Sequence, residues 1–117
     1  MKQTVPPSRR FNSRIETRDG VWVYWRCNGH DDTSRVRDVS LGGLFIETQK
    51  TRQVGTTAVV DFLVQDGQIR AEAVVRHVEP GNGLGMKFTA VNLGDRANLI
   101  GLLNRLRSVL RHEPRAL

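Results

Sequence analysis

Two short segments of the sequence, residues 9–14 and 38–43, carry the residue types that bind a phosphorylated purine. The first segment is arginine-rich, and a planar guanidinium can bond phosphate oxygens or the O6/N7 edge of guanine. In the second segment, Asp38 can accept from guanine N1–H and N2–H₂, and Ser40 can donate to a phosphate. Gly43 lacks a side chain and lets a ligand approach the backbone. Together the segments predict a site for a guanine-bearing phosphodiester.

Neither segment is specific by itself. The spacing Arg-x-x-x-Arg recurs at positions 10/14, 14/18, 107/111 and 111/115, so composition alone produces it. Arg10 and Arg14 differ from the last two pairs because they precede every predicted strand, whereas four-residue spacing on a helix is simply one side of that helix. The Asp38-x-Ser40-x-x-Gly43 pattern lies where a strand ends, and ordinary turn chemistry is its alternative explanation.

Composition sets the class of protein. The 117 residues suffice for one domain, and the net charge of +6 favours an anionic partner, with a merely soluble basic surface as the alternative. No segment is apolar enough to span a membrane and the N-terminus is unlike a signal peptide, so we expect a cytoplasmic protein without membrane insertion. The single cysteine, Cys27, has no disulfide partner and is expected to be packed in a strand.

The residues also argue against catalysis and a metal site. The three histidines have no metal-ligand spacing, and one cysteine cannot complete a thiolate site. No pattern places a histidine to activate Ser40. We therefore expect a protein that is not an enzyme and has no catalytic residues, metal or cofactor.

Hydrophobic alternation predicts six strands between residues 21 and 90. The expected strands are 21–25, 34–39, 44–48, 57–65, 68–78 and 84–89. Asn28-Gly29 and Asp66-Gly67 predict tight hairpin turns, and Asp31 and Asp32 are expected to lengthen the first loop. Short hairpins without helical crossovers favour a six-stranded antiparallel β-barrel.

The two ends of the chain have a different character. Residues 1–8 and 112–117 are predicted as tails, and residues 9–19 as a mobile, arginine-rich arm. Residues 94–111 are predicted as an amphipathic helix, because leucines recur at i, i+3, i+4 and i+7 and Asn92 can cap its start. The fold class is therefore all-β with one C-terminal helix, in a single domain over residues 9–111.

Four features follow one another in an order typical of one family. They are Arg10-x-x-x-Arg14, Asp38-x-Ser40-x-x-Gly43, the segment Gly83-Leu84-Gly85-Met86-Lys87-Phe88 and the terminal helix. In this order and spacing the chain resembles a PilZ domain over about residues 9–110. The resemblance implies a six-stranded antiparallel barrel with a C-terminal helix. It also implies a receptor for the bacterial second messenger cyclic di-GMP.

The resemblance further implies a role for each site residue. The arginine arm would wrap the ligand, with Arg10 and Arg14 on guanine edges and phosphates, while the Asp/Ser/Gly motif lies on the barrel wall. Members with an arginine at the position of Arg9 tend to bind two intercalated cyclic di-GMP molecules, so we expect that stoichiometry. Arg76 would lie beside the ligand and stack on a base, and an exposed strand arginine is the alternative.

Because no catalytic domain is attached, the output would be a contact with an unidentified downstream protein or a change in self-association. Two other functions stay open: a general single-stranded nucleic-acid-binding barrel, and a ligand-free protein-interaction adaptor. Exposed aromatic residues would favour the nucleic-acid-binding barrel, but Trp22, Tyr24 and Trp25 are expected mainly in the core. The acidic side chain of Asp38 would also have no purpose in a nucleic-acid groove. The exposed face of the helix leaves both a monomer and a homodimer open.

Overall fold

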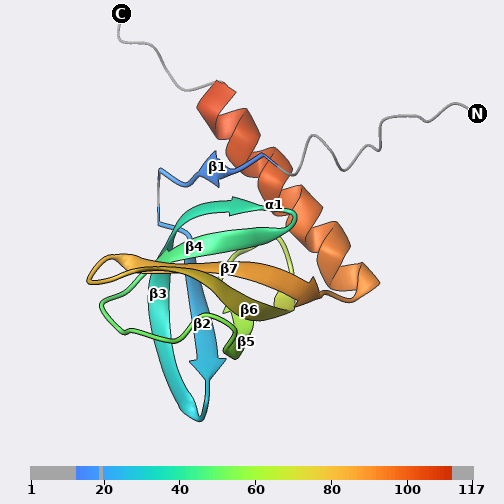
Figure 1. The fold of residues 1–117 in the computed structure, drawn as a ribbon. Coiled ribbons are helices and arrows are strands. Elements are labelled where there is room, and N and C mark those ends of the chain that lie inside the picture. Colours follow the sequence, from blue (N-terminus) through green and yellow to red (C-terminus); the bar gives the residue numbers. More distant parts are fainter. Residues whose placement is uncertain (1–12, 19, 112–117) are drawn as a thin grey trace, which may run out of the picture.

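A closed antiparallel barrel forms most of the molecule, and one helix follows it (Figure 1). The computed structural model describes residues 13–18 and 20–111. Within these residues the elements are β1 (Ile15–Glu16), β2 (Trp22–Cys27), β3 (His30–Ser40), β4 (Gly43–Glu47), β5 (Thr57–Phe62), β6 (Arg70–Glu79), β7 (Gly83–Ala90) and α1 (Leu93–Arg111). The predicted tails at residues 1–8 and 112–117 lie outside the described residues.

Strand pairing closes the barrel through six of the strands. The sheet runs β2-β5-β6-β7-β4, and β3 pairs with both β4 and β2 to complete the ring. All of these pairings are antiparallel. The predicted six-stranded barrel with one C-terminal helix is therefore confirmed.

The alternation of the strands explains which side chains fill the barrel. In β2, Val23, Trp25 and Cys27 point inward and are buried, whereas Trp22 points outward and is 44% exposed. The indole of Trp25 donates to the hydroxyl of Ser34 at 2.9 Å, so its polar atom is satisfied inside the core. Cys27 is a packed strand residue, as expected from the sequence.

The first hairpin is tighter than predicted. Asn28 and Gly29 form the turn, and both have positive φ, at 54° and 79°. Such a two-residue turn matches the twist of the strands, so the ladder resumes at once. Asp31 and Asp32 therefore belong to β3, paired with Arg26 and Trp25, and the expectation that they lengthen the loop was wrong.

The second hairpin is longer than predicted, because the helix packs against its loop. The structure ends β5 at Phe62 and begins β6 at Arg70, so Asp66-Gly67 lies within a connection of residues 63–69. Arg105 of the helix donates from Nε and Nη2 to the Asp66 carboxylate, at 3.0 and 2.7 Å. These hydrogen bonds raise the pKa of the Arg105 guanidinium above its ordinary value.

The helix begins directly after Asn92, the predicted capping residue. The Asn92 side chain accepts from the amide of Asp95 at 2.8 Å. Leu99, Leu102 and Leu103 are fully buried against the barrel, which confirms the predicted apolar face. In residues 13–18 and 20–111, no helix combines the length and apolar character that crossing a membrane requires.

Residues 15 and 16 of the arginine-rich arm form a short strand, whereas the sequence predicted a mobile segment over residues 9–19. Ile15 pairs with Val39 and Glu16 with Asp38, so β1 extends the edge of β3 beyond the end of β2. The Ile15 side chain is buried, which gives this short strand an apolar anchor. In Figure 1, β1 lies between the barrel and α1.

Candidate ligand-binding site

The arm and the strand motif meet through one ion pair. Arg14 Nη1 donates to Asp38 Oδ1 at 2.8 Å, although the two residues are 24 positions apart in the chain. The Asp38 side chain is only 12% exposed, whereas that of Arg14 is 51% exposed. The structure thus brings together two residues that the sequence predicted for one site. Arg9 and Arg10 lie outside the described residues.

Thr17 fixes the arm to the barrel three residues beyond Arg14. Its hydroxyl donates to the carbonyl of Val36, and its amide donates to the carbonyl of Arg37 at 3.0 Å. Its own carbonyl accepts from Arg35 Nη2 at 2.8 Å. Thr17 is buried and its hydroxyl bond is shielded from water, so it helps to hold Arg14 next to Asp38.

A β-bulge in β3 adds a second arginine beside Asp38. Val36 pairs with Ile46 and Asp38 with Phe45, so Arg37 is the extra residue on the bulged strand. Arg37 Nε donates to Asp38 Oδ2 at 3.3 Å. Both oxygens of the carboxylate therefore carry a guanidinium in this structure.

The guanidinium of Arg37 lies flat against an outward-facing aromatic ring. Its Cζ is 3.7 Å from the centre of the Phe45 ring, and its Nη1 is 3.5 Å from Glu79 Oε1. The other side of the ring faces β7, where a Cβ on Gly83 would come within 2.4 Å of it. Phe45 is therefore buried on the outside of the barrel, between two strand glycines and an arginine.

Ser40 and Gly43 have structural roles at the end of β3. The Ser40 hydroxyl accepts from the amide of Gly42 at 3.1 Å, which is a turn contact. A Cβ on Gly43 would lie 2.2 Å from the carbonyl oxygen of Met86, so close pairing with β7 excludes a side chain here. The predicted approach of a ligand to Gly43 remains a prediction.

Strand register places further basic residues around this wall. Gly43 pairs with Lys87, and Gly85 is flanked by Phe45 on one side and His77 on the other.

Arg76 lies in a second bulge, between Val75 and His77, and its side chain is exposed. Its stacking on a ligand base remains a prediction. The sequence analysis did not single out Arg37, Phe45 or Lys87, which strand register and the bulge place beside Asp38 and Gly43.

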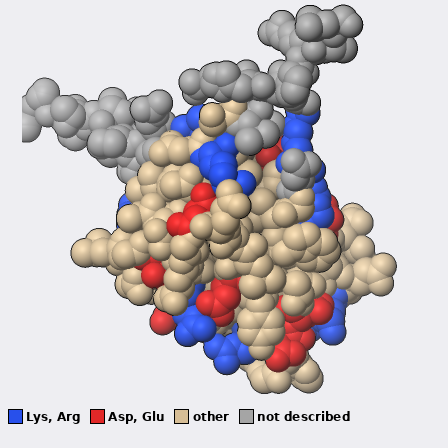
Figure 2. All heavy atoms as spheres, turned by 180° about the vertical axis from the view of Figure 1, so that it is seen from behind, with Lys and Arg blue, Asp and Glu red and all other residues tan. Residues whose placement is uncertain are grey.

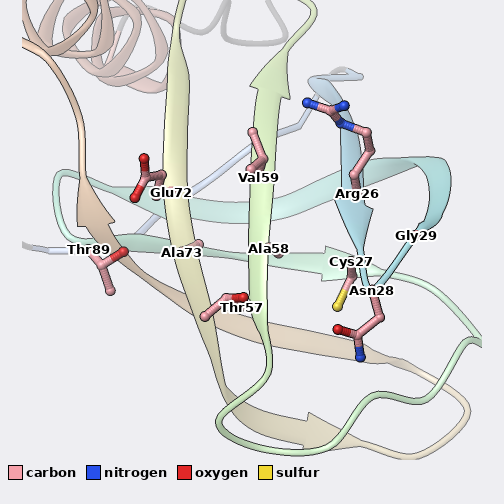
Figure 3. Close-up of a pocket in the computed structure, with 10 residues that line it drawn as sticks. All are labelled: Arg26, Cys27, Asn28, Gly29, Thr57, Ala58, Val59, Glu72, Ala73 and Thr89. Carbon is pink, nitrogen blue, oxygen red and sulfur yellow. The ribbon is translucent and has the colours of Figure 1, made fainter.

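Two hollows on the surface differ in how they relate to this wall. One, of about 490 Å³, is bordered by Arg37, Phe45, Glu47 and Glu79, and Arg37 also contacts Asp38. The other, of about 540 Å³, lies over β2, β5 and β6, and its lining is shown in Figure 3. In that view Glu72 lies on one side of Val59 and Arg26 on the other, so the two charged side chains stand at opposite sides of the hollow.

The charge distribution does not form a single basic surface on the face seen in Figure 2. Basic and acidic side chains lie in mixed clusters there, and wide uncharged areas separate one cluster from the next. A barrel that binds single-stranded nucleic acid without sequence preference would present a continuous basic groove. That face is therefore unlike a general nucleic-acid channel.

The described residues thus form a small antiparallel barrel with one C-terminal helix, in which a basic arm contacts an acidic strand end. A family model of the PilZ domain matches residues 8–105, which is most of the chain, so the chain belongs to the PilZ domain family. A comparison with curated protein sequences found no match.

Solved structures of PilZ domains share the fold. The PilZ domain of YcgR from Escherichia coli, with c-di-GMP, has a TM-score of 0.70 at 20% identity, covering 86% of this chain and 93% of that one. The PilZ domain of CeSA from a cellulose-synthesizing bacterium has a TM-score of 0.64 at 19% identity, covering 81% and 98%. MrkH of K. pneumonia in its apo state has a TM-score of 0.71 at 18% identity, and the match covers 97% of this chain and 56% of MrkH.

Proposed function

We propose that this chain is a non-enzymatic receptor for cyclic di-GMP. Arg9, Arg10 and Arg14 of the arm bind guanine edges and phosphates, and the motif of Asp38, Ser40 and Gly43 supplies the barrel wall. The observation that carries the proposal is the 2.8 Å contact between Arg14 and Asp38. It supports a single site made from two distant segments, as a ligand with both phosphates and guanines requires.

The chemistry of the wall fits the ligand. A carboxylate accepts from guanine N1–H and N2–H₂, and a guanidinium bonds guanine O6 and N7 through two parallel N–H groups. Arg76 and Lys87 are exposed on β6 and β7, where they can reach the phosphates or a base. Two intercalated ligand molecules would use the arginines of the arm and of the wall together.

The signal would pass to a partner protein through the arm. Because β1 lies between the barrel and α1, closure of the arm over a ligand changes the surface that the arm and the helix present (Figure 1). A ligand shifts such an equilibrium by its differential affinity for the two arrangements. The partner reads that surface, and no catalytic group of this chain is needed.

Isothermal titration calorimetry with cyclic di-GMP tests the proposal. We expect saturable binding by the wild type, with two ligand molecules per chain. Arg14→Ala and Asp38→Asn should each weaken binding about 10- to 100-fold, since each removes a hydrogen bond to a charged group. Arg70→Ala is the matched control, because Arg70 forms a similar exposed ion pair with Asp61, away from Asp38.

The outcomes separate the alternatives. Binding of single-stranded oligonucleotides with steep salt dependence, and no preference for cyclic di-GMP, would favour a nucleic-acid function. No heat with either ligand would contradict the receptor proposal and favour an adaptor. Equal affinity in the Arg14, Asp38 and Arg70 variants would contradict the assignment of the site.

A further inference from the structure

Each oxygen of the Asp38 carboxylate already bonds a guanidinium in this structure. Arg14 bonds Oδ1 and Arg37 bonds Oδ2, at 2.8 and 3.3 Å. Under the proposed function, guanine would donate its N1–H and N2–H₂ to the same two oxygens. Each oxygen has a second lone pair, so the carboxylate could accept further donors. The space beside it is nevertheless taken, because Arg37 covers the face of Phe45 next to Asp38.

Arg37 is the arginine whose position copies that of a base. The N1–C2–N2 edge of guanine is itself a guanidine group held in a planar ring. Arg37 presents a planar guanidine to Asp38 while its Cζ lies 3.7 Å from the centre of the Phe45 ring. A purine stacked on Phe45 with its donor edge toward Asp38 would occupy the same place.

The surroundings of Phe45 are built for a planar group. One side of the ring packs on β7, with Gly83 and Gly85 beneath it, and the other is covered by Arg37. The ring is only 4% exposed although it lies outside the apolar cluster of the barrel interior. The hollow of about 490 Å³ borders the same ring, so movement of Arg37 would join this space to Asp38.

We propose that Arg37 occupies a guanine subsite formed by Phe45 and Asp38, and that the bound base displaces it. This inference rests on the proposed receptor function and goes beyond it, since Arg37 belongs to neither motif. Arg37 is then a competitor of the ligand, and it lowers the apparent affinity by holding part of the population in a closed form. The displaced guanidinium returns to solvent.

The contacts that hold Arg37 are individually weak. Its side chain is 44% exposed, and ion pairs and cation–π contacts at exposed sites contribute little each. We therefore expect Arg37→Ala to bind cyclic di-GMP about 5- to 30-fold more tightly than the wild type. Loss of a cation near an anionic ligand would by itself weaken binding, so a gain cannot be a general charge effect.

Calorimetry on the wild type, Arg37→Ala and Arg37→Lys tests this inference, with Arg70→Ala as the control. Lysine keeps the charge but has no planar fork, so Arg37→Lys should also bind more tightly than the wild type. Arg70→Ala should leave the affinity unchanged. If the wild type binds and Arg37→Ala binds equally or more weakly, the inference is overturned while the receptor function stands. If neither protein binds, both are overturned.

Nuclear magnetic resonance gives a second readout that does not depend on affinity. The Arg37 side-chain signals of the free protein should be shifted by the ring current of Phe45, and Phe45→Leu should remove that shift. Saturation with cyclic di-GMP should move these signals to values of a solvent-exposed arginine. Arg37 signals that keep their ring-current shift in the saturated complex would contradict displacement.

Discussion

Thr17 donates its side-chain hydroxyl to the carbonyl of Val36, where β3 bulges toward the candidate site. This bond ties the arm to the strand that carries Asp38. The bulge that Thr17 contacts is also the feature that turns Arg37 onto Phe45. One buried hydroxyl therefore supports both arginines that bond to Asp38.

Replacement of Thr17 by valine tests this anchor. Valine keeps the shape of threonine but loses the buried hydrogen bond, so the free energy of unfolding should fall by about 1–2 kcal/mol. Thr33→Val, at an exposed position of β3, is the matched control and should change stability by less than about 0.5 kcal/mol. Urea denaturation measures both. Equal stability of the two variants would show that the Thr17 hydroxyl does not fix the arm.

Alanine substitutions at the neighbouring residues Gly42 and Gly43 test the packing at the end of β3. A Cβ on Gly43 would lie 2.2 Å from the Met86 carbonyl oxygen, whereas a Cβ on Gly42 would meet no atom closer than 4.0 Å. Gly43→Ala should therefore destabilise the fold by about 1–3 kcal/mol through overpacking, and Gly42→Ala should be near neutral. Thermal unfolding compares the two. A Gly43→Ala variant as stable as Gly42→Ala, yet weaker in ligand binding, would assign Gly43 to the ligand alone.

The ion pair between Arg105 and Asp66 should fix the helix to the β5–β6 loop. Arg105→Ala leaves the Asp66 carboxylate, whose side chain is 12% exposed, without its partner. The paired geometry is bidentate, so we expect a loss of about 1 kcal/mol in the free energy of unfolding, and a smaller loss in 1 M salt. Faster amide hydrogen exchange over residues 99–106 should accompany it. Asn104→Ala, on the exposed side of α1, is the control, and an equal effect there would contradict this role.

Tyr24 provides a pH-dependent test of the barrel's outer surface. Its hydroxyl donates to Asp31 at 2.8 Å, and this hydrogen bond to a carboxylate raises the Tyr24 pKa above its ordinary value. The bond's contribution to stability is complete below the pKa of the unfolded chain, about 10, and is lost as pH rises through the higher pKa of the folded protein.

Absorbance titration can follow this group, because Tyr24 is the single tyrosine of the chain. Asp31→Asn should lower the midpoint toward the ordinary value, and Asp32→Asn should leave it nearly unchanged. A midpoint that responds equally to both substitutions would mean that the titration does not report the hydrogen bond to Asp31.

The sequence predicted the barrel because its strands alternate clearly. Val23 and Trp25 point inward and Trp22 outward, and the glycine at each hairpin marks the turn. The sequence did not predict the length of the β5–β6 loop, because that length is set by contacts with α1, far along the chain. Residues 15 and 16 carry too short an apolar signal for a strand, and their pairing depends on an edge of β3 that β2 leaves open.

For the candidate site, the sequence identified residues but not their arrangement. The motif spacing predicted that Arg14 and Asp38 belong together, because both types suit the same ligand. Arg37 was missed since its role depends on the bulge in β3, and no local pattern marks that bulge. Phe45 was predicted only as part of the strand 44–48, and the glycines of the facing strand explain how a buried ring can lie on the outside of the barrel.

A double-mutant cycle on Arg14 and Asp38 tests the central claim most directly, which is that both residues serve one cyclic di-GMP site. Calorimetry would measure the affinity of the wild type, Arg14→Ala, Asp38→Ala and the double variant. We expect the double variant to lose less binding free energy than the sum of the single losses, with a coupling of about 0.5–3 kcal/mol. Single losses that add without coupling, or single variants that bind as tightly as the wild type, would contradict the claim.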